Sequence, residues 1–383
     1  MSSRPSIWFW QRILTPHMGA LAAAVAERGY SVTFVANARM SANRAAQGWE
    51  APALGKAQFE LAISETEIGV LVEAAPIDSI HLCQGLRGNA LVGQAQRLIR
   101  QRGLRHWAIL ESLDDSGWAG IIRRALYRNL LRRWGSQLEG VLAIGWNTPE
   151  WIAALGLPRA RIIPFAYFLS DVGGGGRAEA VAVSQAGRPF RFMFVGQLVK
   201  LKRVAALVEA LAELNGADVE LWVVGGGPLE ASLKAQAARL LPGRVNWLGV
   251  QPMSAVPALM AQADCLLLPS RHDGWGAVVS ESLMVGTPAI CSDACGSATA
   301  VQASGVGGVF VSGDKDDLVR LMRQCFAKGK ISPNERMRIS SWATSLGADA
   351  GAQYLVEILL YASQGGSKPM PPWGCSGPSV SPS

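Results

Sequence analysis

Two acidic residues, Asp273 and Glu281, flank a glycine-containing turn in the second half of the chain. An apolar, strand-like run ends just before the turn, and a helix is expected from about Ala277. Backbone N–H groups at the start of such a helix point outward and favour anions. Gly274 and Gly276 have no side chain and would let a phosphate approach the backbone closely. The pattern predicts an anion site with Glu281 one helical turn away; the alternative is a plain strand-to-helix turn with a solvated glutamate.

A second candidate segment follows an apolar run at 190–195 and reads Gly196-Gln197-Leu198-Val199-Lys200-Leu201-Lys202-Arg203. It carries three cations, Lys200, Lys202 and Arg203. Taken by itself, such a segment is a basic helix entry that is exposed to water.

Two further segments combine glycines with apolar runs: Gly225-Gly226-Gly227-Pro228 and Val245-Asn246-Trp247-Leu248-Gly249. The first is not a dinucleotide fingerprint, because Glu230 stands where G-x-G-x-x-G requires its last glycine. A dehydrogenase is therefore excluded, whereas a strand, glycine turn and helix remain the expected local structure.

In this order and spacing, the four segments resemble the retaining glycosyltransferases of family 4, which have the two-domain GT-B fold. The resemblance implies that Glu281 binds the ribose hydroxyls of a nucleotide sugar and that Asp273 contacts the sugar. It also implies that Lys202 and the amides around Gly276 bind the diphosphate. Two positions depart from the family: the first acid is usually Glu, and Arg is common at Gln197, whose missing charge Lys200 or Arg203 would supply. The expected donor-binding residues are Gly196, Gln197, Lys202, Gly226, Trp247, Gly274, Trp275, Gly276 and Glu281.

Short apolar runs alternate with helical stretches along most of the chain, which predicts an α/β fold of two Rossmann-like domains facing each other across a cleft. Residues 171–189 contain four consecutive glycines and few apolar side chains, which is typical of a linker. The expected parts are 1–168 as the acceptor-side domain, 169–189 as linker, 190–338 as the donor domain, 339–363 as terminal helices and 364–383 as a disordered tail.

Polar residues in the first half are expected at the carboxyl ends of strands, where ligands of such sheets bind. His17 follows the first strand, His81 lies near the end of another, and Glu111 ends a third. For both histidines the alternative is a structural role in the core. Many family members have a histidine at the position of Glu111, so we expect Glu111, His17 and Asp273 as the catalytic candidates.

The run Ile121–Trp134 has the pattern of an amphipathic helix, with Ile122, Leu126 and Leu130 on one stripe and three arginines on another. A basic amphipathic helix can lie on an anionic membrane surface, and the resemblance to glycosyltransferases that often use lipid-linked acceptors implies such a contact here. The alternative is a core-facing helix with a solvated basic face.

Several classes of protein are excluded by what the sequence lacks. It shows no zinc-finger spacing and no interleaved basic and aromatic stretch, so no nucleic acid is expected as a partner. Six cysteines without a paired metal spacing are expected to be reduced thiols of a cytosolic protein. Asp314-Lys315-Asp316-Asp317 is interpreted as a helix start and not as a metal motif.

The sequence thus predicts a retaining glycosyltransferase that moves a sugar from a nucleotide-diphosphate sugar to a glycan or lipid-linked acceptor, in polysaccharide or cell-envelope glycan synthesis. The nucleotide sugar is a co-substrate, and neither a cofactor nor a metal is expected. The protein is expected in the cytoplasm, peripheral on the inner face of the membrane. Three alternatives are a catalytically inactive GT-B module that binds sugar nucleotides, a nucleotide-sugar epimerase and a phosphorylase, although the last would need a basic phosphate cluster that is not evident.

Overall fold

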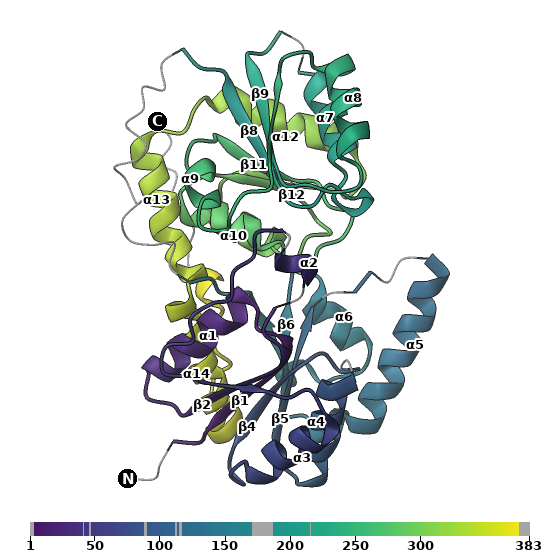
Figure 1. Ribbon diagram of the computed structural model, residues 1–383, viewed down its shortest axis with the longest axis vertical. Helices are drawn as coiled ribbons and strands as arrows, with labels where there is room; N and C mark the ends of the chain where they lie inside the picture. The colour runs from purple at the N-terminus through teal and green to yellow at the C-terminus, as the bar shows by residue number, and fades with distance from the viewer. Residues whose placement is uncertain are drawn as a thin grey trace. The chain divides into compact units, whose positions relative to one another are not determined.

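A computed structural model describes residues 4–40, 42–45, 47–87, 90–111, 113–114, 117–170, 187–214 and 216–374. The chain forms two compact α/β units (Figure 1). The first unit comprises Met1–Ala42, Glu50–Ser170 and Gly347–Pro372, and the second comprises Asn43–Trp49, Asp171–Leu346 and Trp373–Ser383.

In the first unit, the described residues form a seven-stranded parallel sheet with the order β3-β2-β1-β4-β5-β6-β7. Its strands are β1 (Ile7–Ile13), β2 (Val32–Ala38), β3 (Gln58–Leu61), β4 (Ile80–Gln84), β5 (Arg105–Glu111), β6 (Gly140–Ile144) and β7 (Ile162–Phe165). Its helices are α1 (Pro16–Glu27), α3 (Glu65–Ala74), α4 (Ala90–Gln101), α5 (Gly117–Trp134), α6 (Thr148–Ala154) and α14 (Ala348–Gln364), and α2 (Ala42–Ala45) begins where this unit passes into the second.

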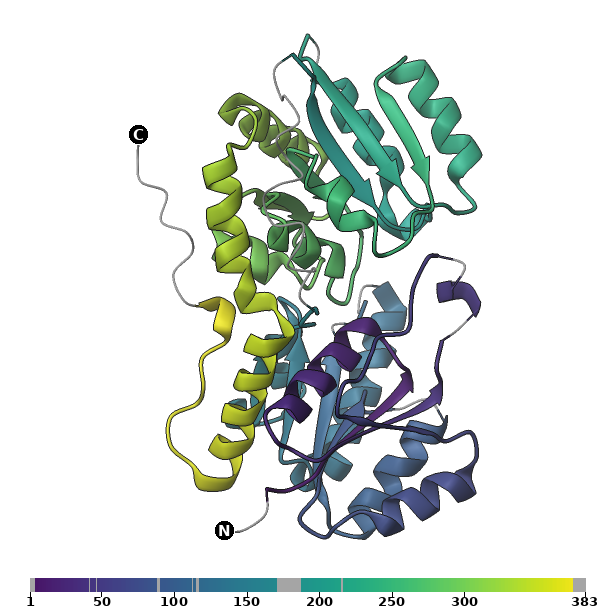
Figure 2. The same cartoon turned by 60° about the vertical axis from the view of Figure 1, so that its left-hand side comes forward.

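Alternation along β1 divides the core of the first unit between the two faces of its sheet. Trp8 and Trp10 lie in the cluster that also contains the buried side chains of α3 and α4. Elsewhere in this unit α14 packs against α1, and the two helices lie side by side in Figure 2. Tyr354 of α14 stacks on Phe165 at 6.0 Å between ring centroids, and its hydroxyl donates to the carbonyl of Pro164. The strands are therefore apolar on both faces, as the continuous runs in the sequence predict.

In the second unit, the described residues form a six-stranded parallel sheet with the order β10-β9-β8-β11-β12-β13. Its strands are β8 (Phe190–Val195), β9 (Val219–Val224), β10 (Val245–Gly249), β11 (Cys265–Leu268), β12 (Ala289–Ser292) and β13 (Gly308–Phe310). Its helices are α7 (Val204–Ala212), α8 (Glu230–Leu240), α9 (Val256–Met260), α10 (Ala277–Met284), α11 (Ala298–Ser304), α12 (Lys315–Lys328) and α13 (Pro333–Ala343).

In each sheet the chain adds strands first on one side of the starting strand and then on its other side. Ligand-binding sites of such sheets are usually found where this change of side occurs. The chain builds outward from β1 to β3 and then returns to add β4 on the other side of β1. In the second unit it builds from β8 to β10 and then adds β11 beside β8. Ligands of open α/β sheets bind beyond the carboxyl ends of the strands at this reversal. Ligands are therefore expected at the segments that follow β1, β4, β8 and β11.

The end of the chain differs from the sequence-based expectation. The terminal helices predicted within 339–363 are the end of α13, in the second unit, and α14, which belongs to the first unit because its apolar side packs on α1 and β7. Disorder was expected from residue 364, but the Lys368 ammonium donates to the carbonyls of Arg159 and Ile162, and Trp373 is buried. Residues 375–383 of the expected tail, and 171–186 of the expected linker, lie outside the described residues.

Candidate functional site

Glycine turns draw together the carboxyl ends of β8, β9 and β10. The Gly196 amide donates to the Val224 carbonyl at 2.9 Å, and the Gly225 amide donates to the Gly249 carbonyl at 2.7 Å. Gly225 has φ +128°, and a Cβ there would lie 1.9 Å from the carbonyl oxygen of Gly196. Only glycine fits at this position, and the two turns can therefore touch through their backbones.

The segment after β11 is held in place by the segment after β12. The Asp273 amide donates to the Ala294 carbonyl at 3.1 Å, and the Ser297 amide donates to the Trp275 carbonyl at 2.7 Å. Trp275 is buried, and its indole N–H donates to the Ser280 hydroxyl at 3.0 Å. A ligand would therefore meet a pre-formed loop, which lowers the ordering cost of binding.

Gly276 closes this loop and serves as the N-cap of α10, with φ +86°. A Cβ at Gly276 would lie 2.7 Å from the Leu268 Cδ2 atom. Helix α10 begins at Ala277, as the sequence predicts. The Gly276 N-cap has no side-chain hydrogen bond to the helix, so no side chain competes at this cap for the first backbone N–H groups.

Lys202 and Asp273 form an ion pair, although the sequence gives them separate roles. Lys202 ends the short 3₁₀ helix Lys200–Lys202 that follows β8, and Asp273 lies in the loop after β11. Both side chains are mostly buried, and the Arg271 amide also donates to the Leu201 carbonyl at 2.8 Å. The two candidates therefore lie at one point, across the reversal between β8 and β11.

Glu281 lies in α10, and its side chain is half-buried. Desolvation by burial raises the pKa of its carboxyl group to about 7. No hydrogen bond or ion pair to this carboxyl group is found among the described residues. Near neutral pH such a group can both accept and donate a hydrogen bond, which suits a hydroxyl ligand.

The remaining donor candidates frame the same edge of the sheet. Gln197 and Gly274 are partly exposed, and Gly226 lies where a Cβ would come 3.1 Å from a Val250 methyl group. Trp247 is half-buried in β10, and the Lys234 ammonium lies 5.9 Å from its ring centroid. All of them belong to the second unit, so the fold gathers this set from segments that are far apart in the sequence.

One aromatic contact of this loop is not foreseen from the sequence. Trp373 packs edge-on against Trp275, with 6.3 Å between the ring centroids. The signal for it is a lone tryptophan in a stretch of Gly, Ser and Pro, because a large apolar side chain in such a stretch usually has somewhere to pack. Trp373 thus supports the loop from the side of the chain end.

In the first unit, His17 and Glu111 lie near carboxyl ends of strands. His17 is in the first turn of α1, which begins at Pro16, a residue compatible with the first helical position. Its ring is nearly buried and lies 3.7 Å from that of Tyr167, centroid to centroid. Glu111 is the last residue of β5 and is partly buried. His17 therefore lies beside the strand reversal, after β1, whereas Glu111 ends β5, one strand further from it.

His81 is a structural residue. Its Nδ1 accepts from the Trp10 indole at 2.9 Å, its Nε2 lies 2.8 Å from the Ser79 hydroxyl, and the hydroxyl in turn donates to the Pro76 carbonyl. Burial lowers the pKa of His81 to about 3, so the ring is neutral. The core alternative for His81 is the correct one.

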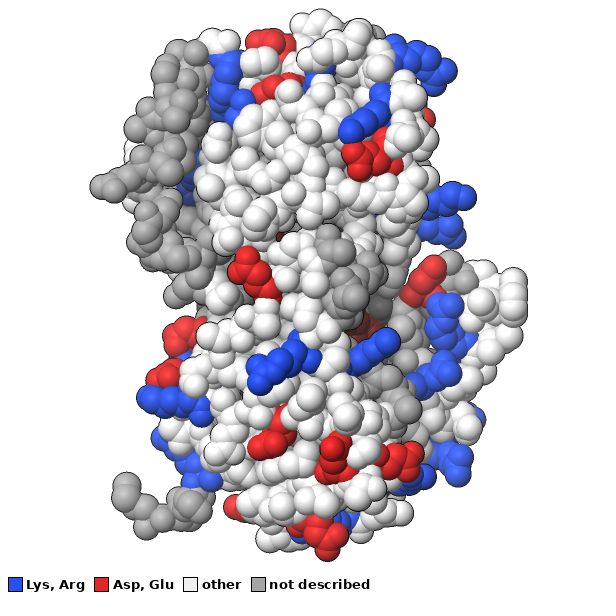
Figure 3. All heavy atoms as spheres, viewed as in Figure 1, with Lys and Arg blue, Asp and Glu red and all other residues white. Residues whose placement is uncertain are grey.

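Helix α5 exposes the side that the core-facing alternative would bury. Its buried residues are Gly120, Tyr127 and Leu131, whereas Ile122 and Leu126 face solvent. Trp118 is 77% exposed and Ile121 is also exposed, so an apolar surface begins in the first turn of the helix. Figure 3 shows blue basic side chains along the edge of the unit where α5 lies in Figure 1. A pocket of about 270 Å³ under the last turns is lined by Arg128 and Arg132.

The acidic run at 314–317 starts a helix. The Asp314 carboxylate accepts from the Asp317 amide at 3.0 Å as the N-cap of α12, as expected. Across the described part of the chain, no group of three or more His, Cys, Asp or Glu side chains is arranged to hold a metal ion. Within the same residues, no helix is both long and apolar enough to cross a membrane. Five cysteines there are free thiols.

Two α/β units, each built on a parallel sheet with helices, are the architecture of the GT-B class of fold. Among solved structures, Anabaena Alr3699/HepE in complex with UDP is similar, with a TM-score of 0.70 and 16% sequence identity, over 92% of this chain and 99% of that one. At this identity the likeness shows the fold.

The sequence of the second unit resembles a known protein family. Residues 178–344 match the family model described as "Glycosyl transferases group 1". A "2-deoxystreptamine glucosyltransferase" of Streptomyces kanamyceticus is 33% identical over 144 residues, 37% of this chain and 30% of the relative. The "Lipopolysaccharide core biosynthesis glycosyltransferase LpsE" of Rhizobium meliloti is 30% identical over 194 residues, 48% of this chain and 54% of the relative. The chain thus spans about a third to a half of the length of these curated relatives.

Proposed function

We propose that this protein is a retaining glycosyltransferase of family 4. It transfers a sugar from a nucleotide-diphosphate sugar to a glycan or lipid-linked acceptor in polysaccharide or cell-envelope glycan synthesis. The match of residues 178–344 to the group 1 glycosyltransferase model and the names of the relatives support this proposal.

The observation that carries the proposal is the convergence of Lys202, Asp273 and the Gly276-capped start of α10 at the strand reversal of the second sheet. A lysine ammonium and free backbone N–H groups together provide positive charge for a diphosphate. Glu281, one turn further along α10, offers a carboxyl group to ribose hydroxyls. The similar solved structure of Anabaena Alr3699/HepE is a complex with UDP, which is consistent with a nucleoside diphosphate as the ligand.

In the proposed reaction, the bond between the anomeric carbon and the diphosphate oxygen breaks. The acceptor hydroxyl oxygen attacks the same face of the sugar, so the configuration is retained. The hydroxyl proton passes to the departing phosphate oxygen, and no separate protein base is required. Lys202 and the α10 amides stabilise the negative charge that develops on the leaving diphosphate, which is the electrostatic contribution that usually dominates catalysis. Asp273 binds the sugar hydroxyls.

The acceptor is proposed to meet the first unit at the carboxyl ends of its strands. His17 in α1 and Glu111 at the end of β5 are the polar side chains that would orient the acceptor hydroxyl there. Helix α5 would bring a lipid-linked acceptor within reach by lying on an anionic membrane surface on the cytoplasmic side. Its exposed Trp118, Ile121 and Ile122 support the apolar half of this contact, and its arginines support the charged half. No metal or cofactor takes part in this scheme.

The test is proton NMR of donor turnover in the presence of EDTA, with a panel of UDP-, GDP- and ADP-sugars and water as the fallback acceptor. An α-linked donor is expected to release the α-sugar first, and Lys202→Ala is expected to abolish the release. Initial release of the β-sugar would contradict retention. Turnover that is lost on adding EDTA and restored by Mg²⁺ would contradict the metal-free scheme. Binding of a nucleotide without turnover of any sugar would favour the inactive binding module.

A further inference from the structure

Arg203 adopts a backbone conformation that costs energy for a side chain of its size. Its φ is 52° and its ψ is 35°, in the left-handed helical region. Among the described residues it is the one non-glycine with positive φ. Glycine would adopt this conformation at lower cost, and such outliers are most often found where the side chain has a function.

The left-handed turn sends Lys202 and Arg203 to different surroundings. Lys202 pairs with Asp273, as described above. The Arg203 guanidinium lies instead against Gly313, where a Cβ would be 3.1 Å from one of its nitrogens. Gly313 has φ +99° and no side chain, so the backbone there makes room for the guanidinium. The two neighbouring cations therefore serve separate places.

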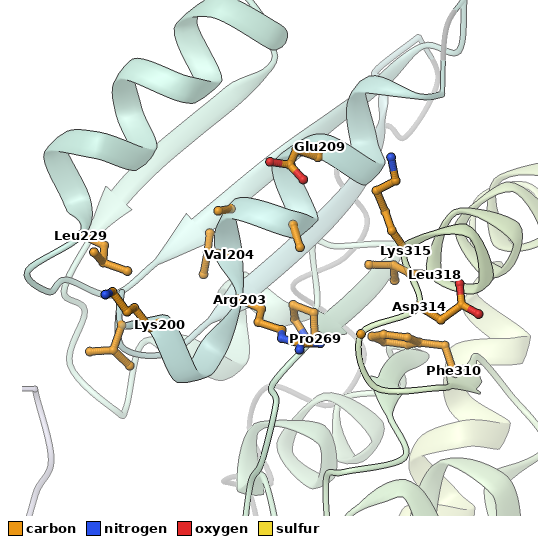
Figure 4. A pocket seen from close by; sticks show the side chains of 14 residues that line it. Lys200, Arg203, Val204, Glu209, Leu229, Pro269, Phe310, Asp314, Lys315 and Leu318 are labelled. Atoms are coloured by element: carbon orange, nitrogen blue, oxygen red, sulfur yellow. The ribbon is translucent and has the colours of Figure 1, made fainter. Parts of the chain in front are cut away.

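Arg203 lines a cavity of about 370 Å³ in the second unit (Figure 4). The cavity lies where the N-terminal ends of α7 and α12 approach each other, with Leu229 and Pro269 also in its wall. In Figure 4 the Arg203 guanidinium extends beside Pro269 toward the ring of Phe310. The volume is in the range of small-molecule sites, which combine apolar walls with a few polar groups. None of the nine expected donor-binding residues lines it, whereas Lys200 and Arg203, which were considered only as substitutes for the charge missing at Gln197, do.

The charges in this cavity leave two cations available. Glu209 accepts from the Gln236 amide at 2.9 Å, and the Asp314 carboxylate is engaged in capping α12. Lys315 is paired with Glu213. The side chains of Lys200 and Arg203 make no ion pair or hydrogen bond to any described residue. A pocket whose acids are engaged and whose arginine is unpaired favours an anionic ligand.

We infer that this cavity is a second anion site, separate from the donor site, for a small organic molecule. Its phosphate or carboxylate group would bind the Arg203 guanidinium, with the Lys200 ammonium adding charge at the entrance. The apolar body of the molecule would lie against Phe310, Pro269 and Leu229. The inference does not depend on sugar transfer, since it uses neither Lys202 nor Glu281.

The experiment uses the full chain and three probes: phenyl phosphate, benzoate and inorganic phosphate, each titrated while backbone amide resonances are followed by NMR. Phenyl phosphate is expected to shift the amides of Phe310, Gly313 and Lys315 in a saturable manner. Because the walls are apolar, it is expected to bind more tightly than inorganic phosphate. Benzoate distinguishes the two chemistries: it competes with phenyl phosphate if a carboxylate suffices and leaves the shifts unchanged if a phosphate is required.

Two variants remove the guanidinium without disturbing the turn. Arg203→Gly relieves the positive φ, and Arg203→Asn retains a residue that tolerates it, so both are expected to fold with unchanged or higher melting temperature. Both are expected to bind phenyl phosphate about tenfold more weakly than the wild type, or worse. The matched control is Lys202→Ala, which changes the preceding residue, on the side of the proposed donor site. This variant is expected to bind phenyl phosphate as tightly as the wild type does. Unchanged affinity in both Arg203 variants, or shifts centred on Gly276 instead of Gly313, would overturn the inference.

Discussion

Lys202 and Asp273 form an ion pair that joins segments 71 residues apart in the chain, and the pair lies next to the start of α10. A diphosphate that binds there meets a lysine whose charge is already balanced by a carboxylate. The Asp273 carboxylate would have to turn away from Lys202, toward the sugar, when the donor enters. The pair thus brings together, at one point of the proposed site, the residue that would bind the phosphate and the residue that would bind the sugar.

Substitutions of the two partners of this pair are expected to change the affinity for a nucleotide in opposite directions. Asp273→Asn removes the carboxylate that competes for Lys202, so a nucleoside diphosphate without sugar is expected to bind about threefold to tenfold more tightly. Lys202→Ala removes the charge and is expected to weaken binding about tenfold or more. Calorimetric titration measures both, with Lys328→Ala as a control lysine that is exposed in the last turn of α12. Weaker binding in Asp273→Asn would show that the carboxylate contributes to the nucleotide site directly.

A methyl group at Gly276 is expected to damage both stability and the anion site. It would meet Leu268 at 2.7 Å and strain a residue with φ +86°, so we expect a loss of about 2–4 kcal/mol of unfolding free energy. Gly243→Ala is the matched control, because Gly243 has φ +71° but nothing within 4 Å of its Cβ position. This control is expected to cost only about 1 kcal/mol. Urea unfolding measures the two values, and equal losses in both variants would contradict the role of the Leu268 contact.

The two buried histidines of β4 and β5 are expected to make the protein acid-sensitive. Burial lowers the pKa of His81 and of His106 to about 3, below the ordinary value near 6.5. The unfolded chain therefore binds more protons between these values. The stability that the neutral rings provide is complete above pH 6.5 and is lost as the pH falls toward 3. Each histidine is expected to contribute a slope of about 1.4 kcal/mol per pH unit in that window.

His106→Leu tests this pH dependence. Both ring nitrogens of His106 are buried and have no hydrogen-bond partner among the described residues, so the leucine replaces a group of similar size without breaking a bond. Urea unfolding from pH 4 to pH 7 is expected to show a shallower slope in the variant than in the wild type. The wild-type slope persisting in His106→Leu would mean that other groups cause the acid sensitivity.

The exposed apolar surface of α5 is expected to bind anionic membranes. Vesicles with phosphatidylglycerol should sediment the wild type, vesicles of phosphatidylcholine alone should not, and high salt should weaken the binding. The double variant Trp118→Ser, Ile122→Ser is expected to lose it. Val70→Ser, Ile77→Ser removes two equally exposed apolar side chains from elsewhere in the same unit and should bind as the wild type does. If the variant Trp118→Ser, Ile122→Ser sediments with these vesicles as the wild type does, α5 does not make the proposed membrane contact.

Much of the second sheet can be predicted from the sequence, because its strands are continuous apolar runs bounded by glycine turns. The strand Phe190–Val195 and the start of α10 at Ala277 have the predicted positions. The strands β3, β7 and β13 were not predicted, because none of them is a continuous run of apolar residues: Pro164 interrupts β7, and β13 has only two apolar side chains. The Gln58–Leu61 strand is mostly exposed and lies at the edge of its sheet, so it lacks the apolar signal altogether.

What the sequence could not provide is the set of contacts between distant segments. The pair Lys202–Asp273, the packing of Trp373 on Trp275 and the docking of α14 on the first unit all depend on tertiary structure. Arg203 was considered only as a substitute for a missing charge near Gln197. Its side chain lies against Gly313 instead, because the left-handed backbone at this residue turns the side chain away from the donor candidates.

The central claim is that the second unit binds the nucleotide of a sugar donor, and the most direct measurement is calorimetric titration of UDP, GDP and ADP without metal. One nucleotide is expected to bind with a dissociation constant on the order of micromolar. Glu281→Ala is expected to lose this binding by about tenfold or more, whereas Glu357→Ala, on the exposed side of α14, should retain it. Binding that is unchanged in Glu281→Ala, or no binding of any nucleotide to the wild type, would contradict the claim.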